Sequence, residues 1–180
     1  MHPNCAAVNE ILQAAGVAGR VRLLDEAVTT ARAAAEQLGC PVGAIANSLI
    51  FETFSKATAG APLLIMTSGA HQVDMRKVGE QLGSQLRRAS PAFVREHTHQ
   101  PIGGVAPVGH PKPIRTVVDR TLAEFDDVDA RAGVPLDRLI VHAETPAGGI
   151  PVDAPRANGS KLSPEDPRIN LITLQTDVTQ

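Results

Sequence analysis

The sequence predicts an α+β domain in which helices and strands are mixed and neighbouring strands form hairpins. Helical and strand-like patterns succeed one another without the regular strand–helix–strand repeat of a doubly wound parallel sheet. Two strand-like runs, 45–51 and 63–67, are separated only by a polar segment, which favours a hairpin with a long loop. The chain has 180 residues, 43% hydrophobic and 20% charged, which suits one globular domain with a substantial core.

The N-terminal part of the chain predicts two helices and a short strand between them. Apolar side chains from Val8 to Ala15 follow the spacing of one helix face. Residues 21–24 form a short strand candidate. Thr30 is a candidate N-cap for an alanine-rich helix that reaches Leu38, and the glycine that follows is typical of a helix end.

After the expected hairpin, the sequence predicts two further helices. Asp74 can cap a helix that carries apolar side chains on one face and stops at Gly83. Ser90 followed by Pro91 predicts a second helix start, because proline is favoured at the first helical position.

The last third of the chain predicts a strand over 114–118, a helix marked by its apolar spacing and a short strand over 139–141. The apolar positions of that helix are Leu122, Phe125 and Val128. From Glu144 onward the chain is rich in Pro, Gly, Asp and Asn without a sustained period. We therefore expect a domain over 1–142 and a disorder-prone Pro/Gly-rich C-terminal tail over 143–180.

The segment Pro101–His110 combines three glycines and two prolines in ten residues, so it cannot continue a helix or a central strand. Such a loop holds backbone N–H groups at fixed angles with little side chain in the way. It suits a ligand that the backbone approaches closely, and an ordinary tight turn is the alternative. It lacks the GxxxxGK[ST] pattern of a phosphate loop.

Composition excludes several classes of protein. A net charge of −2 and the absence of Trp and Tyr argue against a general nucleic-acid coat, so any RNA contact is expected at a strand end. No apolar run approaches the length of a membrane span, so we expect no membrane partner, and DNA is not expected either. Cys5 and Cys40 lack a CxxC spacing, and the simplest account is a reduced, cytoplasmic setting.

Histidine and serine residues offer two possible catalytic arrangements, and ordinary surface or core roles are the alternative for each. His97, His99 and His110 are candidate zinc ligands, but no HExxH or Cys/His pattern accompanies them, so no metal site is expected. A triad of Ser48 or Ser68 with His110 and Asp119 lacks the GxSxG elbow that exposes a serine nucleophile. Both remain weak alternatives to satisfied side chains.

Several separated segments together resemble the YbaK/prolyl-tRNA-synthetase-associated domain family of aminoacyl-tRNA deacylases. The resemblance runs from about Val8 to Gly133, and its segments follow one another in the family's order. They are Thr30–Ala35 with Leu38–Cys40, Ile45–Phe51, Leu63–Asp74, Gly103–Gly109 with its GxxxP pattern, and Val117–Asp119.

The resemblance implies the family's fold, a mixed and partly barrel-like β-sheet flanked by helices. It implies hydrolysis of a small amino acid from mischarged tRNA, in trans, without a cofactor or metal. The implied partners are the acceptor end of aminoacyl-tRNA and a prolyl-tRNA synthetase. In this family the terminal adenosine and its ester lie in a small pocket lined by paired strands and closed by the GxxxP loop.

The site residues follow from matching this sequence to the family pattern. Those assigned to catalysis are Gly103, Gly104 and Asn47, the glycine N–H groups orienting the ester carbonyl and stabilising its oxyanion. Those assigned to substrate binding are Ser48, Thr30, Thr67, Ser68, Pro107, Gly109, His110 and Asp119.

Asn47 is a departure, because the family usually has a lysine at this position. A neutral hydrogen bond contributes about 0.5–1.5 kcal/mol, against about 1.5–3 kcal/mol for one with a charged partner. The alternative hypothesis is therefore a non-catalytic member that binds an aminoacyl-tRNA end, a nucleotide or a protein.

Overall fold

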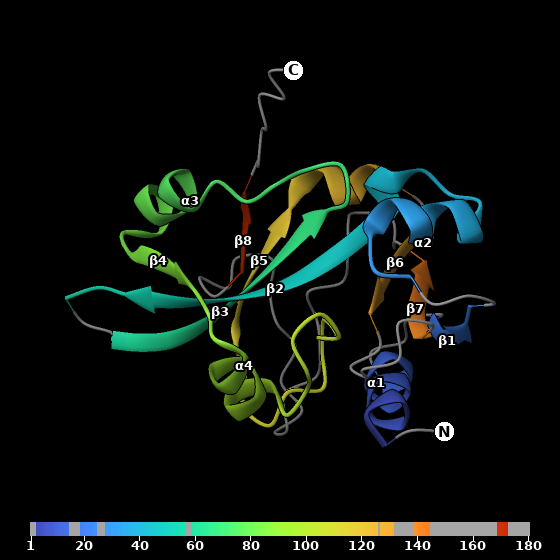
Figure 1. Ribbon diagram of the computed structural model, residues 1–180, viewed down its shortest axis with the longest axis horizontal. Coiled ribbons are helices and arrows are strands. Elements are labelled where there is room, and N and C mark those ends of the chain that lie inside the picture. The colour runs from blue at the N-terminus through green and yellow to red at the C-terminus, as the bar shows by residue number, and fades with distance from the viewer. Residues whose placement is uncertain are drawn as a thin grey trace.

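The computed structural model describes residues 3–14, 19–24, 28–56, 59–125, 127–131, 139–144 and 169–172, which form a mixed sheet flanked by helices (Figure 1). The helices are α1 (Pro3–Ala14), α2 (Ala31–Leu38), α3 (Met75–Leu82) and α4 (Pro91–Thr98), with short 3-10 turns η1 (Val42–Ala44) and η2 (Arg120–Glu124). The strands are β1 (Gly19–Leu23), β2 (Ile45–Phe54), β3 (Ala59–Ser68), β4 (Gln85–Arg88), β5 (Arg115–Asp119), β6 (Asp127–Arg131), β7 (Leu139–Glu144) and β8 (Ile169–Ile172). The predicted α+β class is confirmed.

The sheet is an open path in the order β1-β7-β6-β2-β3-β5-β8, with β4 paired to β2 outside this path. The pairs β2–β6, β3–β5 and β5–β8 are parallel, whereas the other ladders are antiparallel. The family resemblance implies a partly barrel-like sheet, and the described strands form a mixed sheet that does not close.

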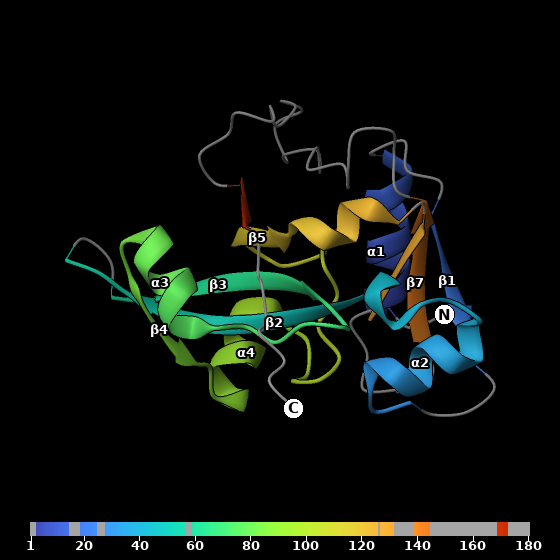
Figure 2. The same ribbon diagram turned by 90° about the horizontal axis from the view of Figure 1, so that it is seen from above.

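The β2–β3 hairpin forms the centre of the sheet, and its two strands, with ten residues each, are the longest that the structure describes. Its strands pair from Ala46 with Ser68 to Phe54 with Ala59, with a register shift between Thr53 and Phe54. Viewed from above, the hairpin extends as an arm beyond α3 and β4, while α1, α2, β1 and β7 gather at the opposite end (Figure 2).

The two faces of the hairpin pack against different elements. Side chains in a strand alternate between faces, so Ala46 and Ile50 point to one side and Phe51 points to the other. The first face packs against α4 through Val94 and, through Val105, against the segment Pro101–His110, called the Gly/Pro loop below. The opposite face packs against α3 through Val78, and Ile45 at its end packs against α2. In Figure 1, α3 and α4 accordingly lie above and below the hairpin.

The predicted helix caps are confirmed. The hydroxyl of Thr30 accepts from the N–H of Ala33 (3.1 Å), and Asp74 caps α3 through two backbone N–H groups. The hydroxyl of Ser90 accepts from the N–H of Phe93 (3.2 Å), ahead of a proline in the first turn. Glycines end two of these helices in the left-handed conformation, Gly39 at φ 67° and Gly83 at φ 62°.

The predicted helix over Leu122, Phe125 and Val128 is wrong. Asp119 accepts from the N–H of Thr121 (3.1 Å) and starts only the short turn η2, after which the chain becomes strand β6. Val128 and Ala130 both belong to the main core cluster, and their spacing of two places them on the same face of a strand. Pairing with β7 and β2 outweighs the local helical spacing.

Three other features differ from the expectation. The hairpin strands continue to Phe54 and resume at Ala59, so the loop between them is shorter than predicted. Strand β4 was not predicted, because its sequence is mostly charged or polar and short. Strand β8 lies within the expected tail and pairs with β5, while the rest of 143–180 lies mostly outside the described residues, so that domain boundary stays a prediction. No helix among the described ranges has the length and apolar character to cross a membrane.

The core on β3 gives a direct stability test. Leu64 is fully buried between the hairpin, α4 and the Gly/Pro loop, whereas Leu49 on the neighbouring strand is 38% exposed. We expect Leu64→Ala to lower the free energy of unfolding by about 2–5 kcal/mol. Leu49→Ala, the matched control, should lower it by less than about 1 kcal/mol. Urea denaturation of the three proteins measures both effects, and similar losses for the two variants would contradict the assigned core.

Candidate functional site at the open edge of β2

The edge of β2 that faces away from β3 is only partly paired. At its start, Ile45 and Ala46 pair with β6, and at its end, Phe51–Phe54 pair with β4. Between them, residues 47–50 have β3 on one side and no neighbouring strand on the other, among the strands that the structure describes. The gap leaves outward-facing backbone groups of a central strand without a strand partner in the described part of the chain, which is uncommon away from a sheet margin.

A small pocket opens at the β6 end of this gap. It has a volume of about 40 Å³, more than the roughly 10–15 Å³ that one water needs. Three elements supply the lining residues, which are Thr29, Thr30, Ala31 and Ala34 from the start of α2, Ile45, Ala46 and Asn47 from β2, and Asp129 and Ala130 from β6. The pocket is therefore small and mixed in polarity.

Two predicted site residues, Thr30 and Asn47, meet in this pocket. The Thr30 hydroxyl is held in place as the α2 cap, so it contributes to the wall in a fixed orientation. The Asn47 side chain is half-buried and forms no hydrogen bond with the described part of the chain. Asn47 thus offers an amide that can donate to or accept from a ligand.

Gly69 fixes the wall of the pocket on the β3 side. Its N–H donates to the carbonyl of Ile45 (2.7 Å), which ties the end of β3 to the start of β2. A Cβ at this position would lie 2.5 Å from the Val42 carbonyl oxygen and 2.8 Å from the Ala31 Cβ. Only glycine permits α2 to approach this closely, so Gly69 sets where the first turn of α2 stands.

The Gly/Pro loop lies on the opposite face of β2 from Asn47. Gly103 and Gly109 have φ values of 79° and 87°, which favour glycine. The N–H of Gly104 donates to the carbonyl of Pro101 (3.0 Å), and the N–H of Ala106 donates to the Gln100 side-chain oxygen (2.7 Å). Gly104 is therefore buried in a turn, and its N–H is engaged within the loop instead of facing a ligand.

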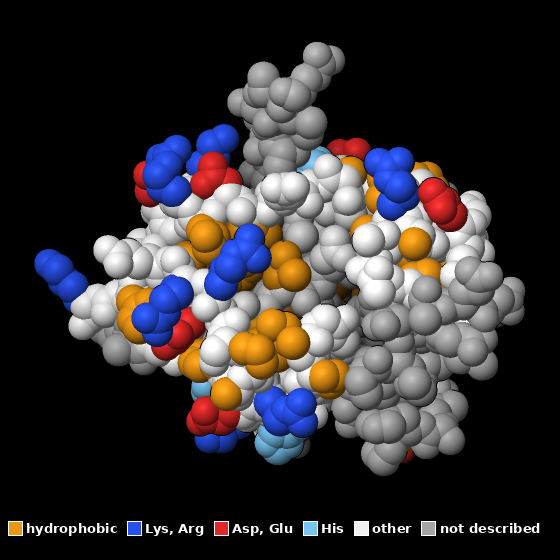
Figure 3. All heavy atoms as spheres, in the orientation of Figure 1, with side chains coloured by type: hydrophobic (Ala, Val, Ile, Leu, Met, Phe, Trp, Pro, Cys, Tyr) orange, Lys and Arg blue, Asp and Glu red, His pale blue; other side chains and the backbone are white. Residues whose placement is uncertain are grey.

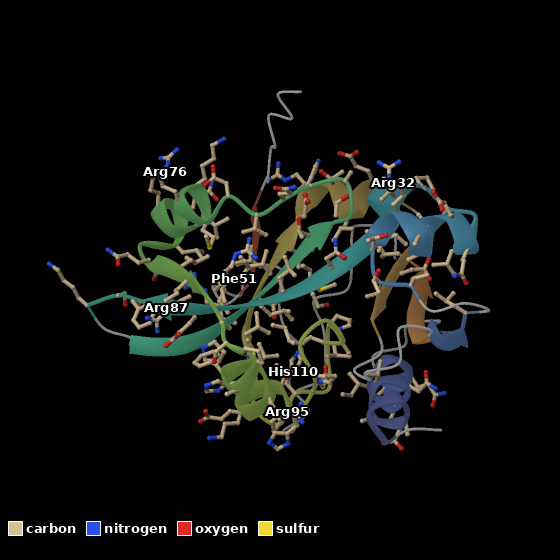
Figure 4. All side chains as sticks on the ribbon, in the orientation of Figure 1. Arg32, Phe51, Arg76, Arg87, Arg95 and His110 are labelled. Atoms are coloured by element: carbon tan, nitrogen blue, oxygen red, sulfur yellow. The ribbon has the colours of Figure 1, made fainter. Side chains whose placement is uncertain are left out.

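Buried polar atoms without partners gather on the loop side. The Ser48 hydroxyl and both ring nitrogens of His110 are buried and have no hydrogen-bond partner among the described residues. Figure 4 places His110 below β2, on the side of α4. Burial lowers the pKa of His110 to about 4, so the ring is neutral at physiological pH. Unpaired buried polar groups are rare in proteins, which makes Ser48 and His110 candidates for ligand contacts.

Asp119 organises a separate cluster at the ends of β3 and β5. Its carboxylate accepts from the N–H groups of Ser68 and Thr121, both at 3.1 Å, and from the Thr67 hydroxyl at 3.5 Å. The Nδ1 atom of His71 lies 2.7 Å from the same carboxylate. Asp119 is 1% exposed, so these bonds compensate a buried charge.

The predicted site residues therefore fall into three groups. Thr30 and Asn47 line the pocket. Ser48, Gly103, Gly104, Pro107, Gly109 and His110 belong to the loop side of β2. Thr67, Ser68 and Asp119 bond to one another within the sheet, where they support β3 and do not face open space. Their assignment as substrate-binding residues stays a prediction.

His71 was missed by sequence reasoning. It follows the end of β3 without a motif, and only the parallel pairing of β3 with β5 brings it to Asp119. Among the described residues, no group of three or more His, Cys, Asp or Glu side chains is arranged to hold a metal ion.

Residues 25–144 match the family model of the aminoacyl-tRNA editing domain. The chain belongs to this family. The editing-domain match covers the pocket, the Gly/Pro loop and the Asp119 cluster, and it confirms the YbaK-like resemblance of the sequence. Members of the family act in aminoacyl-tRNA editing, so the match supports a hydrolase in general terms.

Individual relatives agree with the editing-domain assignment. The chain is 31% identical over 96 residues to a proline–tRNA ligase of Burkholderia thailandensis, covering 53% of this chain and 17% of that protein. It is 32% identical over 104 residues to the uncharacterized protein YwhH of Bacillus subtilis, covering 58% of this chain and 64% of that protein. The matches thus span less than two thirds of the length of these curated relatives.

Solved structures show the same fold. A crystal structure described as a proposed trans-editing enzyme for prolyl-tRNA synthetase has a TM-score of 0.69 and 32% identity, covering 80% of this chain and 88% of that chain. The crystal structure of the hypothetical protein APE2540 has a TM-score of 0.65 and 28% identity, covering 76% and 87% of the two chains.

The Asp119 cluster predicts a large loss of stability on substitution. Asp119→Ala would leave the buried N–H group of Ser68 and the partly buried N–H group of Thr121 without their acceptor. We expect the free energy of unfolding to fall by about 2–4 kcal/mol. Asp74→Ala removes an exposed helix cap and should cost about 1 kcal/mol. Equal losses in chemical denaturation would argue against the cluster as the tie between β3 and η2.

Burial of His110 predicts a pH dependence of stability. The pKa of His110 in the folded state, about 4, lies below the usual histidine value of 6.5, so the unfolded state binds a proton first as pH falls. The free energy of unfolding should therefore decrease between about pH 6.5 and pH 4, by at most about 3 kcal/mol from this group. His110→Gln should flatten this part of the pH profile, measured by urea denaturation. Parallel profiles for wild type and variant would contradict a buried neutral ring.

Proposed function

We propose that this protein is a trans-acting deacylase that hydrolyses the ester of a mischarged tRNA carrying a small amino acid. The observation that carries the proposal is the small pocket at the open edge of β2, within a chain that belongs to the aminoacyl-tRNA editing domain family. A pocket of about 40 Å³ suits a short side chain and rejects a long one by steric exclusion.

We propose that the acceptor end of the tRNA is the part that enters the site, because the gap beside β2 is open to the single-stranded end of an RNA from one side. The amino acid would occupy the pocket between α2 and Asn47, and the terminal ribose would lie across residues 47–50. Asn47 would hydrogen-bond the ribose or the ester, and the Gly/Pro loop would bound the site on the other face. The name of the 32%-identical structural relative supports a tRNA of the prolyl system as the source.

The proposed reaction needs no nucleophile from the protein. Water attacks the ester carbonyl carbon, the bond to the ribose oxygen breaks, and that oxygen takes a proton while the free amino acid leaves. The Gly103 N–H is the candidate donor to the oxyanion, since the Gly104 N–H is engaged with Pro101. A neutral His110 and the Ser48 hydroxyl are candidates to orient the water.

The second candidate is a non-catalytic binder of an aminoacyl-tRNA end. Asn47 favours it, because this residue replaces the lysine that the family usually has and lacks its charge. Under this hypothesis, the native chain binds without turnover and Asn47→Lys creates deacylation.

A panel of mischarged tRNAs separates the two candidates. For a deacylase, we expect wild type to hydrolyse tRNA(Pro) esters of small amino acids faster than those of valine or phenylalanine. Asn47→Ala should lower kcat/KM up to about tenfold, because it removes a neutral hydrogen bond. Thr53→Ala, whose hydroxyl bonds the hairpin itself, is the control and should leave the rate unchanged. No hydrolysis above buffer for any amino acid would rule the deacylase out.

A further inference from the structure

One strip of β2 runs from the pocket toward the end of β4, and it includes an exposed side chain, Leu49, that neither the core nor the pocket uses. Asn47, Leu49 and Phe51 point to the same face of the strand, and Arg88 of β4 lies directly opposite Phe51. Residues two apart in a strand are separated by about 7 Å. An amide, an apolar side chain and a guanidinium thus follow one another from the pocket to the end of β4.

Leu49 is exposed in an unusual position. It is 38% exposed, although it lies in the middle of a central strand, and Leu49 and Ile102 are the two exposed large hydrophobic residues in the described ranges. Its exposure follows from the placing of the helices on this face, since α2 packs on Ile45 and α3 packs on Phe51 while Leu49 lies between them. An apolar side chain at such a site offers a surface on which the flat face of a base can rest.

Arg88 is an exposed cation beside this gap. Its neighbour Arg87 is tied by an ion pair to Glu52 (2.7 Å) and lies 4.7 Å over the Phe54 ring. Arg88 itself is exposed and has no acidic partner in the described part of the chain. An unpaired, exposed guanidinium is suited to a phosphate, which it can bind with two parallel hydrogen bonds.

Cationic side chains lie on either side of the strip, in a surface of mixed charge (Figure 3 and Figure 4). Figure 3 shows Lys and Arg side chains over α2, α3 and β4, with Asp and Glu side chains beside them and hydrophobic side chains exposed between these groups. Figure 4 shows Arg87 and Arg32 on opposite sides of Phe51 on this face. Arg76 and Arg87 are paired with Glu80 and Glu52, so a phosphate contact on this face depends on Arg88.

We infer that the strip Asn47–Leu49–Arg88 is a binding track for the single-stranded 3′ end of an RNA. The inference rests on the proposed function, which puts the terminal ribose at Asn47. The penultimate base would rest on Leu49, and an upstream phosphate would bind Arg88, about 13 Å from Asn47 along β2. The order of side chains along the strand thus gives the direction of the RNA, with its 3′ terminus at the pocket and its duplex beyond β4.

RNA binding by fluorescence anisotropy tests the track without requiring catalysis. The probe is a stem–loop RNA that carries no amino acid and has a single-stranded 3′ CCA end. It is compared with the same stem–loop without that end. We expect Arg88→Ala to weaken binding of the complete probe about fivefold to tenfold and to lower the salt slope of log Kd by about 0.7. Leu49→Ser should weaken binding without changing that slope, because it removes no charge. Neither variant should affect the probe that lacks the 3′ end.

Arg95→Ala is the matched control, because Arg95 is an equally exposed arginine on α4, which packs against the opposite face of the hairpin. It should leave the affinity and the slope nearly unchanged. An equal effect of Arg95→Ala, unchanged binding in Arg88→Ala, or no binding of the complete probe by wild type would each overturn the track. Since Leu49 and Arg88 are exposed, circular dichroism should show all variants folded.

The binding track and the deacylase activity can each be rejected without rejecting the other. Arg88-dependent RNA binding with no hydrolysis in the tRNA panel would reject the deacylase and retain the track. Hydrolysis by wild type that is equal in Arg88→Ala and Leu49→Ser, for both aminoacyl-tRNA and aminoacyl-adenosine, would reject the track and retain the deacylase. If both hold, Arg88→Ala should slow hydrolysis of aminoacyl-tRNA and leave aminoacyl-adenosine unaffected, since the latter has no upstream phosphate.

Discussion

The unequal pairing of β2 is the constraint on which the rest of the structure depends. One edge is paired along the strand by β3, whereas the other is shared by two strands, β6 at its start and β4 at its end. Because β6 and β4 do not meet, a central strand keeps an accessible stretch without being a sheet margin. The pocket, the exposed leucine and the exposed arginine all lie along this stretch or at its ends.

The two faces of β2 differ in the surroundings that they give to a ligand. The α2 side is held rigid by the close approach of Gly69 and by the carboxylate of Asp119, whose bonds tie the end of β3 to η2. The loop side instead contains buried polar atoms without partners, at Ser48 and His110. A ligand in the gap meets a preorganised wall on one side and unsatisfied donors and acceptors on the other.

The sequence predicted the features that depend only on interactions between neighbouring residues. The caps at Thr30, Asp74 and Ser90 depend on a hydrogen bond to a nearby backbone group, so the sequence contains the whole interaction. The span of Val128 was misjudged because pairing with strands distant in the sequence replaced its helical spacing with a strand. The contact of His71 with Asp119 was out of reach for the same reason, since it depends on which strands become neighbours.

The open stretch of β2 also bears on how such a domain can diversify. Its length depends on where β4 and β6 stop, and neither strand supplies the residues that lie within it. Adding or removing a residue pair at the end of β4 would narrow or widen the entrance while the pocket wall stayed intact. Substrate preference could therefore drift through small insertions in a short, charged strand, with the core and the chemistry of the pocket untouched.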